Sequence, residues 1–121
     1  MDKVELEQRT KQFAIRVIGF VSSLPKSSAS IVLGNQLLKS GTSIGANYRE
    51  ANRAQSKRDF IYKVGIVEKE ASESRYWLEL FHDTQLGDSQ ARMVLLKEAE
   101  ELTAIFTAIG RSCKKREPRM K

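Results

Sequence analysis

Apolar side chains recur at intervals of three, four and seven residues along most of this chain, and that spacing excludes most folds. A period near 3.6 residues is typical of an amphipathic helix, whereas a half-buried strand alternates between polar and apolar at every second position. The pattern predicts four helices and no strand, with the helices over residues 2–24, 30–54, 56–83 and 89–112. Four helices with short connections indicate an all-α fold, an antiparallel up-down-up-down four-helix bundle.

The breaks between these segments carry residues that end or begin helices. Pro25 is expected to end the first helix, because proline lacks a backbone donor and disfavours a helical residue before it. The serines of residues 26–30 offer N-caps for the second helix. Residues 56–59 have the S-x-x-D form of a capping box, which predicts the start of the third helix. Gly87 breaks the chain before the fourth helix, and Asp88 is the expected cap of that helix.

The apolar stripes also predict which side chains fill the core. The first helix is expected to bury Leu6, Phe13, Val17, Phe20, Val21 and Leu24. The fourth helix is expected to bury Met93, Val94, Leu96, Ala99, Leu102, Ile105, Phe106 and Ile109. The bundle is therefore expected to occupy residues 1–112. Residues 113–121 are rich in lysine and arginine and are expected to form a flexible basic C-terminal tail.

The second predicted helix is rich in small and polar residues. Gly34, Gly41 and Gly45 recur at spacings of seven and four. Glycine inside a helix costs about 1 kcal/mol relative to alanine, so we interpret these glycines as a surface that a neighbouring helix approaches closely. A second face, at spacings of three, four and three, is formed by Ser40, Ser43, Asn47 and Glu50. The alternative for that face is simple solvation. The residues predicted to form a packing seam or an oligomer contact are Gly41, Ser43, Asn47 and Glu50.

Positive charge is concentrated in two parts of the chain. The net charge is +6, but residues 64–110 contribute −5, whereas residues 39–63 contribute +4 and residues 111–121 contribute +5. Affinity for nucleic acids comes mainly from neutralised phosphates, so these two basic zones are the candidate binding surface. Ordinary solubilising charge is the alternative. The candidate nucleic-acid-binding residues are Arg49, Arg53, Lys57, Arg58, Lys63, Arg111, Lys114, Lys115 and Arg116.

The sequence gives little support to catalysis or metal binding. Cys113 is the one cysteine, which excludes an intrachain disulfide and a thiolate zinc cluster. Glu79 and His82 have the E-x-x-H spacing of ferritin-like metal sites, but such bundles need two of these motifs and this chain has one histidine. Arg75 and His82 form an R-x6-H arrangement that resembles the signature of helical ribonucleases of the HEPN type, and this remains an alternative. We expect no enzyme activity, no cofactor and no metal.

The cellular location is inferred from what the sequence lacks. No apolar run approaches the ~18–20 residues that cross a bilayer. The residues after Met1 do not have the basic-then-apolar layout of a secretory signal. A lone cysteine fits a reducing compartment. A cytoplasmic protein with no membrane partner is therefore expected.

Several motifs in order resemble one known family. Residues 36–51 read QLLKSGTSIGANYREA, residues 56–63 read SKRDFIYK, and residues 69–74 read KEASES, followed by Trp77 and Leu78. These resemble the small bacterial bundle proteins named after 23S ribosomal RNA intervening sequences, over about residues 10–110. Many relatives carry Asn-Ile-Ala-Glu-Gly where this chain has Asn-Tyr-Arg-Glu-Ala at residues 47–51, which indicates a different branch.

The resemblance implies an antiparallel four-helix bundle that assembles as a homopentamer. It also implies a fold similar to the accessory protein of diversity-generating retroelements, a basic pentamer that binds nucleic acid and a reverse transcriptase. Together with the basic zones, it leads us to predict a non-enzymatic, oligomeric bundle that binds nucleic acid, with RNA as the expected ligand. A protein-binding scaffold and a retroelement accessory factor are the alternatives.

Overall fold

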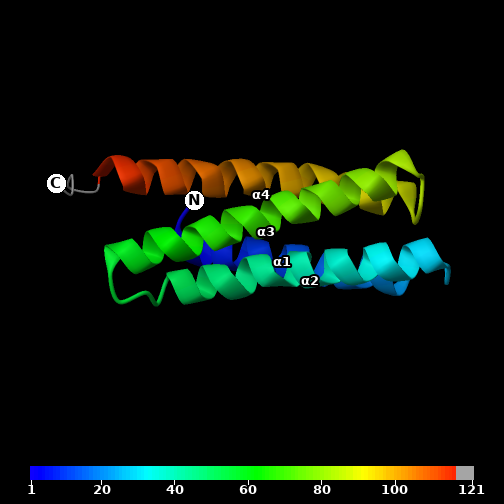
Figure 1. Ribbon diagram of the computed structural model, residues 1–121, viewed down its shortest axis with the longest axis horizontal. Coiled ribbons are helices and arrows are strands. Elements are labelled where there is room, and N and C mark those ends of the chain that lie inside the picture. The colour runs from blue at the N-terminus through cyan, green and yellow to red at the C-terminus, as the bar shows by residue number, and fades with distance from the viewer. Residues whose placement is uncertain (117–121) are drawn as a thin grey trace.

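The computed structural model describes residues 1–116 and, for Arg116, only the backbone. It contains α1 (Lys3–Ser22), α2 (Ser28–Ala51), α3 (Lys57–Asp83) and α4 (Ser89–Arg116), with no strand among the described residues. The helices run alternately up and down along one elongated bundle (Figure 1). The predicted fold class is therefore confirmed. None of the four helices, as far as they are described, combines the length and apolarity needed to cross a membrane.

The helices begin where the sequence predicts caps. The Ser56 hydroxyl accepts a hydrogen bond from the Asp59 amide at 3.0 Å. The Asp88 carboxylate accepts one from the Ala91 amide at 2.9 Å. Ser27 caps α2 in the same way, so α2 begins two residues earlier than predicted. Each cap satisfies a backbone donor that the first helical turn leaves unpaired.

The ends of α2 and α4 differ from the predicted ends. The second helix ends at Ala51, three residues before the predicted end. The fourth helix continues to Arg116, so residues 113–116, which the sequence predicts to be part of the tail, are helical. Residues 117–121 of the predicted tail lie outside the described residues. The basic residues of α4 therefore extend the bundle along its axis.

The core is formed by aliphatic and aromatic side chains from all four helices. The rings of Phe20 and Phe81 pack edge to face with their centroids 5.2 Å apart, and the centroids of the Tyr48 and Phe106 rings are 5.1 Å apart. The largest fully buried side chains are Phe13, Phe81, Phe106, Leu37, Ile44, Leu78, Leu95, Leu102, Val17, Val64, Val67 and Thr10. The predicted inward residues of α1 all contribute to this core or pack against it.

The predicted inward stripe of α4 is wrong at its start. Met93 and Val94 are 58% and 46% exposed, whereas Leu95 is buried. The first turn of α4 instead buries Arg92, which donates a hydrogen bond from Nη1 to the Gly87 carbonyl at 2.7 Å. A charged residue therefore occupies an inward position of α4. Apolar spacing alone does not identify such a position, so it assigns the apolar residues that follow to the core instead.

The glycines of α2 face α1 within the same chain. A Cβ atom at Gly41 would lie 3.0 Å from the Val17 side chain, and one at Gly45 would lie 3.1 Å from Thr10. Contacts this close leave little room for any side chain. The small residues therefore bring α1 close to α2, and Gly41 is buried inside its own chain.

Candidate nucleic-acid interface

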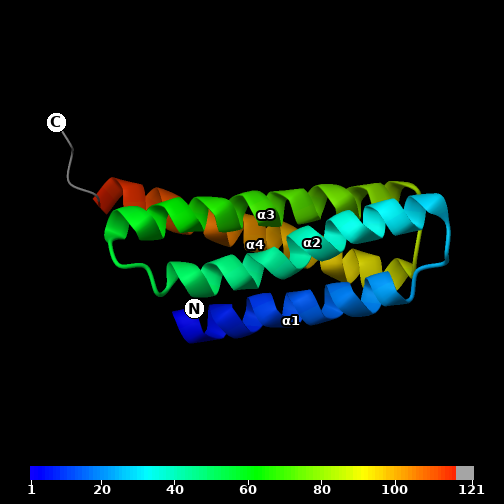
Figure 2. The same cartoon turned by 60° about the horizontal axis from the view of Figure 1, so that its bottom comes forward.

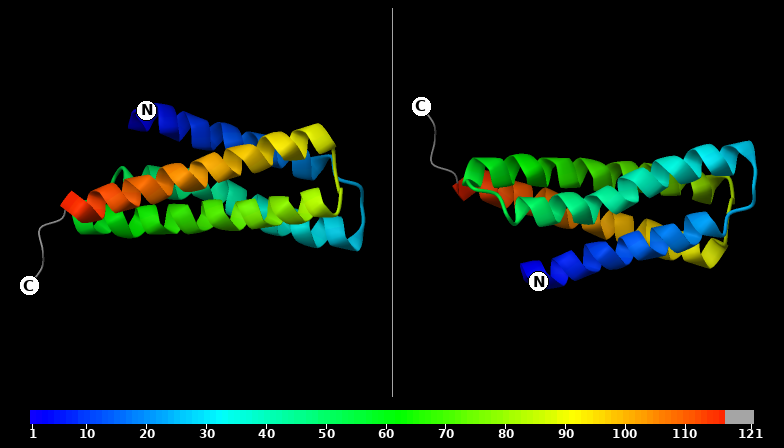
Figure 3. Two further views of the ribbon diagram at one scale, coloured as in Figure 1. Left: turned by 90° about the horizontal axis from the view of Figure 1, so that it is seen from above. Right: turned by 90° about the horizontal axis from the view of Figure 1, so that it is seen from below.

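The alternating helix directions bring the two basic zones together. The start of α1, the end of α2, the start of α3 and the end of α4 all lie at one end of the bundle (Figures 1 and 2). At this end α3 and α4 extend beyond α1 and α2 (Figure 3). We call residues 49–63 and 111–116 the basic end. They hold nine basic and two acidic residues, a net charge of +7.

Several cations of the basic end have no acidic partner within residues 1–116. Two cations of the basic end form ion pairs with described residues: Arg49, which lies 3.9 Å from Glu7, and Lys63, which lies 3.7 Å from Glu50. Arg58 is exposed but is not one of the unpaired cations, because it is already engaged in an interaction. The exposed cations without an ion pair in the described chain are Arg53, Lys57, Arg111, Lys114 and Lys115. These side chains are available to neutralise phosphates.

A polar hollow lies between the end of α2 and the start of α3. Its volume is about 700 Å³, and it is lined by Glu50, Arg53, Ala54, Gln55, Ser56, Asp59 and Lys63. Two acidic and two basic residues line it, so the hollow itself has little net charge. The excess positive charge of the basic end therefore lies on the outer faces of α3 and α4 rather than in this hollow.

The predicted polar seam divides between two environments. The Ser40 hydroxyl is buried and accepts a hydrogen bond of 2.8 Å from Ser74 of α3. Ser43 and Asn47 are half-buried, and their side chains donate to backbone carbonyls of α2 itself. Glu50 is exposed beside Lys63. This face therefore contacts α3 of the same chain near its middle and reaches solvent toward the basic end.

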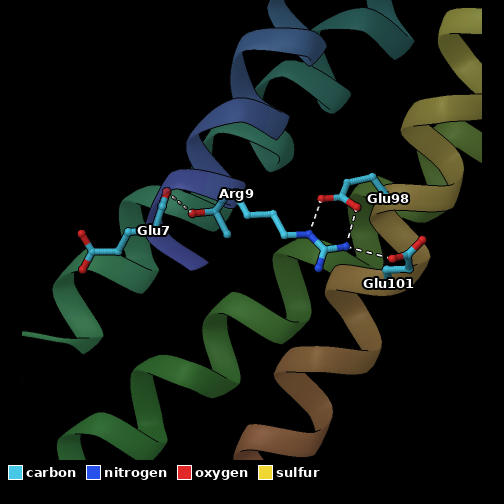
Figure 4. Close-up of polar contacts among 5 residues, drawn as sticks. Glu7, Arg9, Glu98 and Glu101 are labelled. Carbon is cyan, nitrogen blue, oxygen red and sulfur yellow. Dashed lines mark hydrogen bonds and ion pairs between the residues drawn. The ribbon is translucent and has the colours of Figure 1, made fainter. Parts of the chain in front are cut away.

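A polar clamp that the sequence pattern does not reveal holds α1 to α4 (Figure 4). The Arg9 guanidinium donates to both Glu98 oxygens, at 2.6 and 2.7 Å, and to Glu101 at 2.9 Å. The hydrogen bond to Glu98 raises the pKa of Arg9 above its ordinary value. On the other side of α1, the Asn52 amide donates to Glu7 at 2.8 Å. The only sequence signal was an i,i+3 pair of glutamates on the expected α4 surface, which does not identify its partner.

We expect the Arg9–Glu98 pair to stabilise the bundle by about 1–2 kcal/mol, because it is bidentate and only 26% and 19% of the two side chains are exposed. A double-mutant cycle with Arg9→Ala and Glu98→Ala, followed by urea unfolding, measures this coupling. The matched control is Arg75–Glu79, an i,i+4 pair at 3.8 Å with 45% of each side chain exposed, for which about 0.3–0.5 kcal/mol is expected. Equal couplings for the two pairs would contradict the clamp.

The alternative catalytic residues lie far from the basic end. Arg75 and His82 are two turns apart in the second half of α3, and Arg75 pairs with Glu79. At 1.5 Å per residue, His82 lies about 37 Å along the helix from Lys57. His82 Nδ1 is buried without a partner, so it faces protein rather than solvent. Among the described residues, no three His, Cys, Asp or Glu side chains gather as metal ligands. Arg75 and His82 therefore lie outside the basic end.

These features define a small antiparallel four-helix bundle with its positive charge gathered at one end. Comparison with known families is decisive: the chain belongs to the 23S rRNA-intervening sequence protein family, whose sequence profile matches residues 2–108. It is also similar to the crystal structure of a protein of unknown function from the S23 ribosomal protein family of Bacteroides thetaiotaomicron. The two are 35% identical, with a TM-score of 0.82, over 92% of this chain and 99% of that one. No match was found among curated proteins.

Proposed function

We propose that this protein is a non-enzymatic bundle that binds RNA at its basic end. The observation that carries the proposal is the convergence of two basic zones, far apart in sequence, at one end of the molecule. Phosphate neutralisation supplies most of the affinity of such surfaces. The family name refers to 23S rRNA intervening sequences, which supports RNA as the nucleic acid.

We also propose that the protein acts as a homo-oligomer, with the pentamer of the family resemblance as the expected form. The helices α1 and α4 carry the support for this. Between them lies a largely apolar hollow of about 520 Å³, which includes Phe20, Ala91 and Val94. Ile15 and Ile18 of α1 and Met93 of α4 are also exposed. A closed ring would bury apolar surface of this kind and repeat the basic end in each subunit.

The experiment that tests RNA binding is a titration of a structured RNA with the full chain at several salt concentrations. We expect the logarithm of the association constant to fall linearly with the logarithm of salt concentration, as counterion release requires. Absence of binding at 50 mM salt would overturn the proposal. Sedimentation at micromolar concentration tests the assembly, and a species of 13.7 kDa would exclude it.

The α1–α4 hollow also favours a protein partner as a second candidate. Such a partner would bind away from the basic end, so its binding would be independent of salt-sensitive RNA contacts. Competition distinguishes the two: RNA would not displace a protein bound at the hollow, whereas it would displace one bound at the basic end.

A further inference from the structure

We propose that Tyr62 is a stacking platform for an unpaired nucleobase, so that the RNA bound at the basic end includes single-stranded nucleotides. This inference rests on the proposed function and specifies its ligand. Base stacking on an aromatic side chain is available to any base whose π-face is uncovered, and bases inside a duplex are covered by their neighbours.

Tyr62 differs from the other two tyrosines in its surroundings. Its side chain is 68% exposed, in the second turn of α3. Tyr48 is only 4% exposed and packs against Phe106. Tyr76 is 53% exposed, but its ring meets Trp77 at 5.1 Å. Within the part of the chain that the structure describes, Tyr62 has no ring partner and no hydrogen bond. Its ring is therefore exposed at the basic end with neither face covered by another ring of the described chain, whereas Phe60, two residues earlier, is packed against the core.

The position one turn after Tyr62, on the same helix face, carries no side chain. That residue is Gly65, and a Cβ atom there would meet nothing within 4 Å. In helices, aromatic side chains lean toward the N-terminus, so the Tyr62 ring is expected to lie toward Arg58 and away from Gly65. A base on the ring would therefore meet no side chain from position 65.

Positive charge flanks this ring along the same helix face. Residues three, four and seven apart share one face of a helix, which places Arg58 before Tyr62 and Lys69 after it. At 1.5 Å per residue, these two positions lie about 6 Å and about 10 Å from Tyr62 along the axis. Both side chains are exposed. A base on the ring would thus have its phosphates between cations, the combination typical of surfaces that bind single strands.

The test compares a 12-nucleotide oligoadenylate with a 12-base-pair RNA duplex, using fluorescence anisotropy and the full chain at one salt concentration. We expect Tyr62→Ala to weaken oligoadenylate binding about tenfold, within the range measured when stacking residues are truncated. Duplex binding should change less than twofold. Tyr62→Phe keeps the ring and should retain the affinity. Tyr76→Ala is the matched control and should change neither affinity.

A second variant tests the open side of the ring. Gly65→Leu would add a bulky side chain one turn after Tyr62 on the same helix face, and it should weaken oligoadenylate binding while sparing the duplex. Because both sites are exposed or open, thermal unfolding should show that these variants remain folded.

The outcomes separate this inference from the proposed function. If Tyr62→Ala weakens both ligands equally, or leaves oligoadenylate binding unchanged, stacking is overturned while binding at the basic end stands. A chain that binds only the duplex would overturn stacking in the same way. If the wild-type chain binds neither RNA, the proposed function itself fails.

Discussion

Removing four cations from the basic end is expected to weaken RNA binding by at least about a hundredfold at 50 mM salt. The slope of the logarithm of the association constant against the logarithm of salt concentration should also become shallower by about 3. Fewer phosphate contacts form, so RNA binding releases fewer counterions. Sequence preference should not change, since contacts to phosphates carry no base information. The four substitutions, all to alanine at exposed residues without ion pairs, are Arg53→Ala, Lys57→Ala, Lys114→Ala and Lys115→Ala.

The chain offers a control with the same change in net charge. Four other exposed cations lie outside the basic end, so their removal also lowers the net charge from +6 to +2. If location matters, this control should bind RNA within about threefold of the wild type at the same salt concentration. Equal losses for the two variants would show that net charge alone governs binding. The control substitutions are Lys11→Ala, Arg16→Ala, Lys26→Ala and Lys97→Ala.

The second large effect is expected at Gly87, in the connection between α3 and α4. Its φ is +80°, where an L side chain is strained, and a Cβ atom there would lie 2.7 Å from the Phe20 ring and 2.8 Å from Leu24. Gly87→Ala should therefore lower the free energy of unfolding by about 2–5 kcal/mol, from backbone strain and overpacking together. Urea unfolding measures this loss.

Gly65→Ala is the matched comparison and should act in the opposite direction. Gly65 lies inside α3, and its Cβ would meet open space. The substitution should raise the free energy of unfolding by about 0.5–1 kcal/mol, because alanine is the better helix former. If Gly87→Ala were as stable as the wild type, the connection would have to be free to rearrange, contrary to its packing against Phe20.

The features that follow from short-range chemistry were predictable from the sequence. Ser56 and Asp88 were expected to cap helices, and each accepts the hydrogen bond that a cap requires. A cap depends on residues three positions apart, so it needs no knowledge of the tertiary structure. The spacing of apolar residues likewise predicted the four helices and the bundle.

The features that depend on neighbouring helices were less predictable. Arg92 is buried because backbone carbonyls of the α3–α4 connection accept its hydrogen bonds, a partner that no periodicity reveals. The Arg9–Glu98 contact joins residues 89 positions apart. Of the candidate site, the sequence identified two charged zones but not their meeting at one end. The single reversal between α3 and α4 returns the chain to the end at which α3 begins, so this meeting follows from the fold.

The projection of α3 and α4 beyond the other two helices has a consequence for how this protein can evolve. The cations Lys57, Lys114 and Lys115 in these projecting turns are exposed and contribute nothing to the buried core. Substitutions of these lysines should therefore change the free energy of unfolding little. Substitutions of Phe106 or Leu102, which are buried in α4, should lower it strongly. Selection can therefore alter which ligand is recognised, and how tightly, while the scaffold is inherited unchanged.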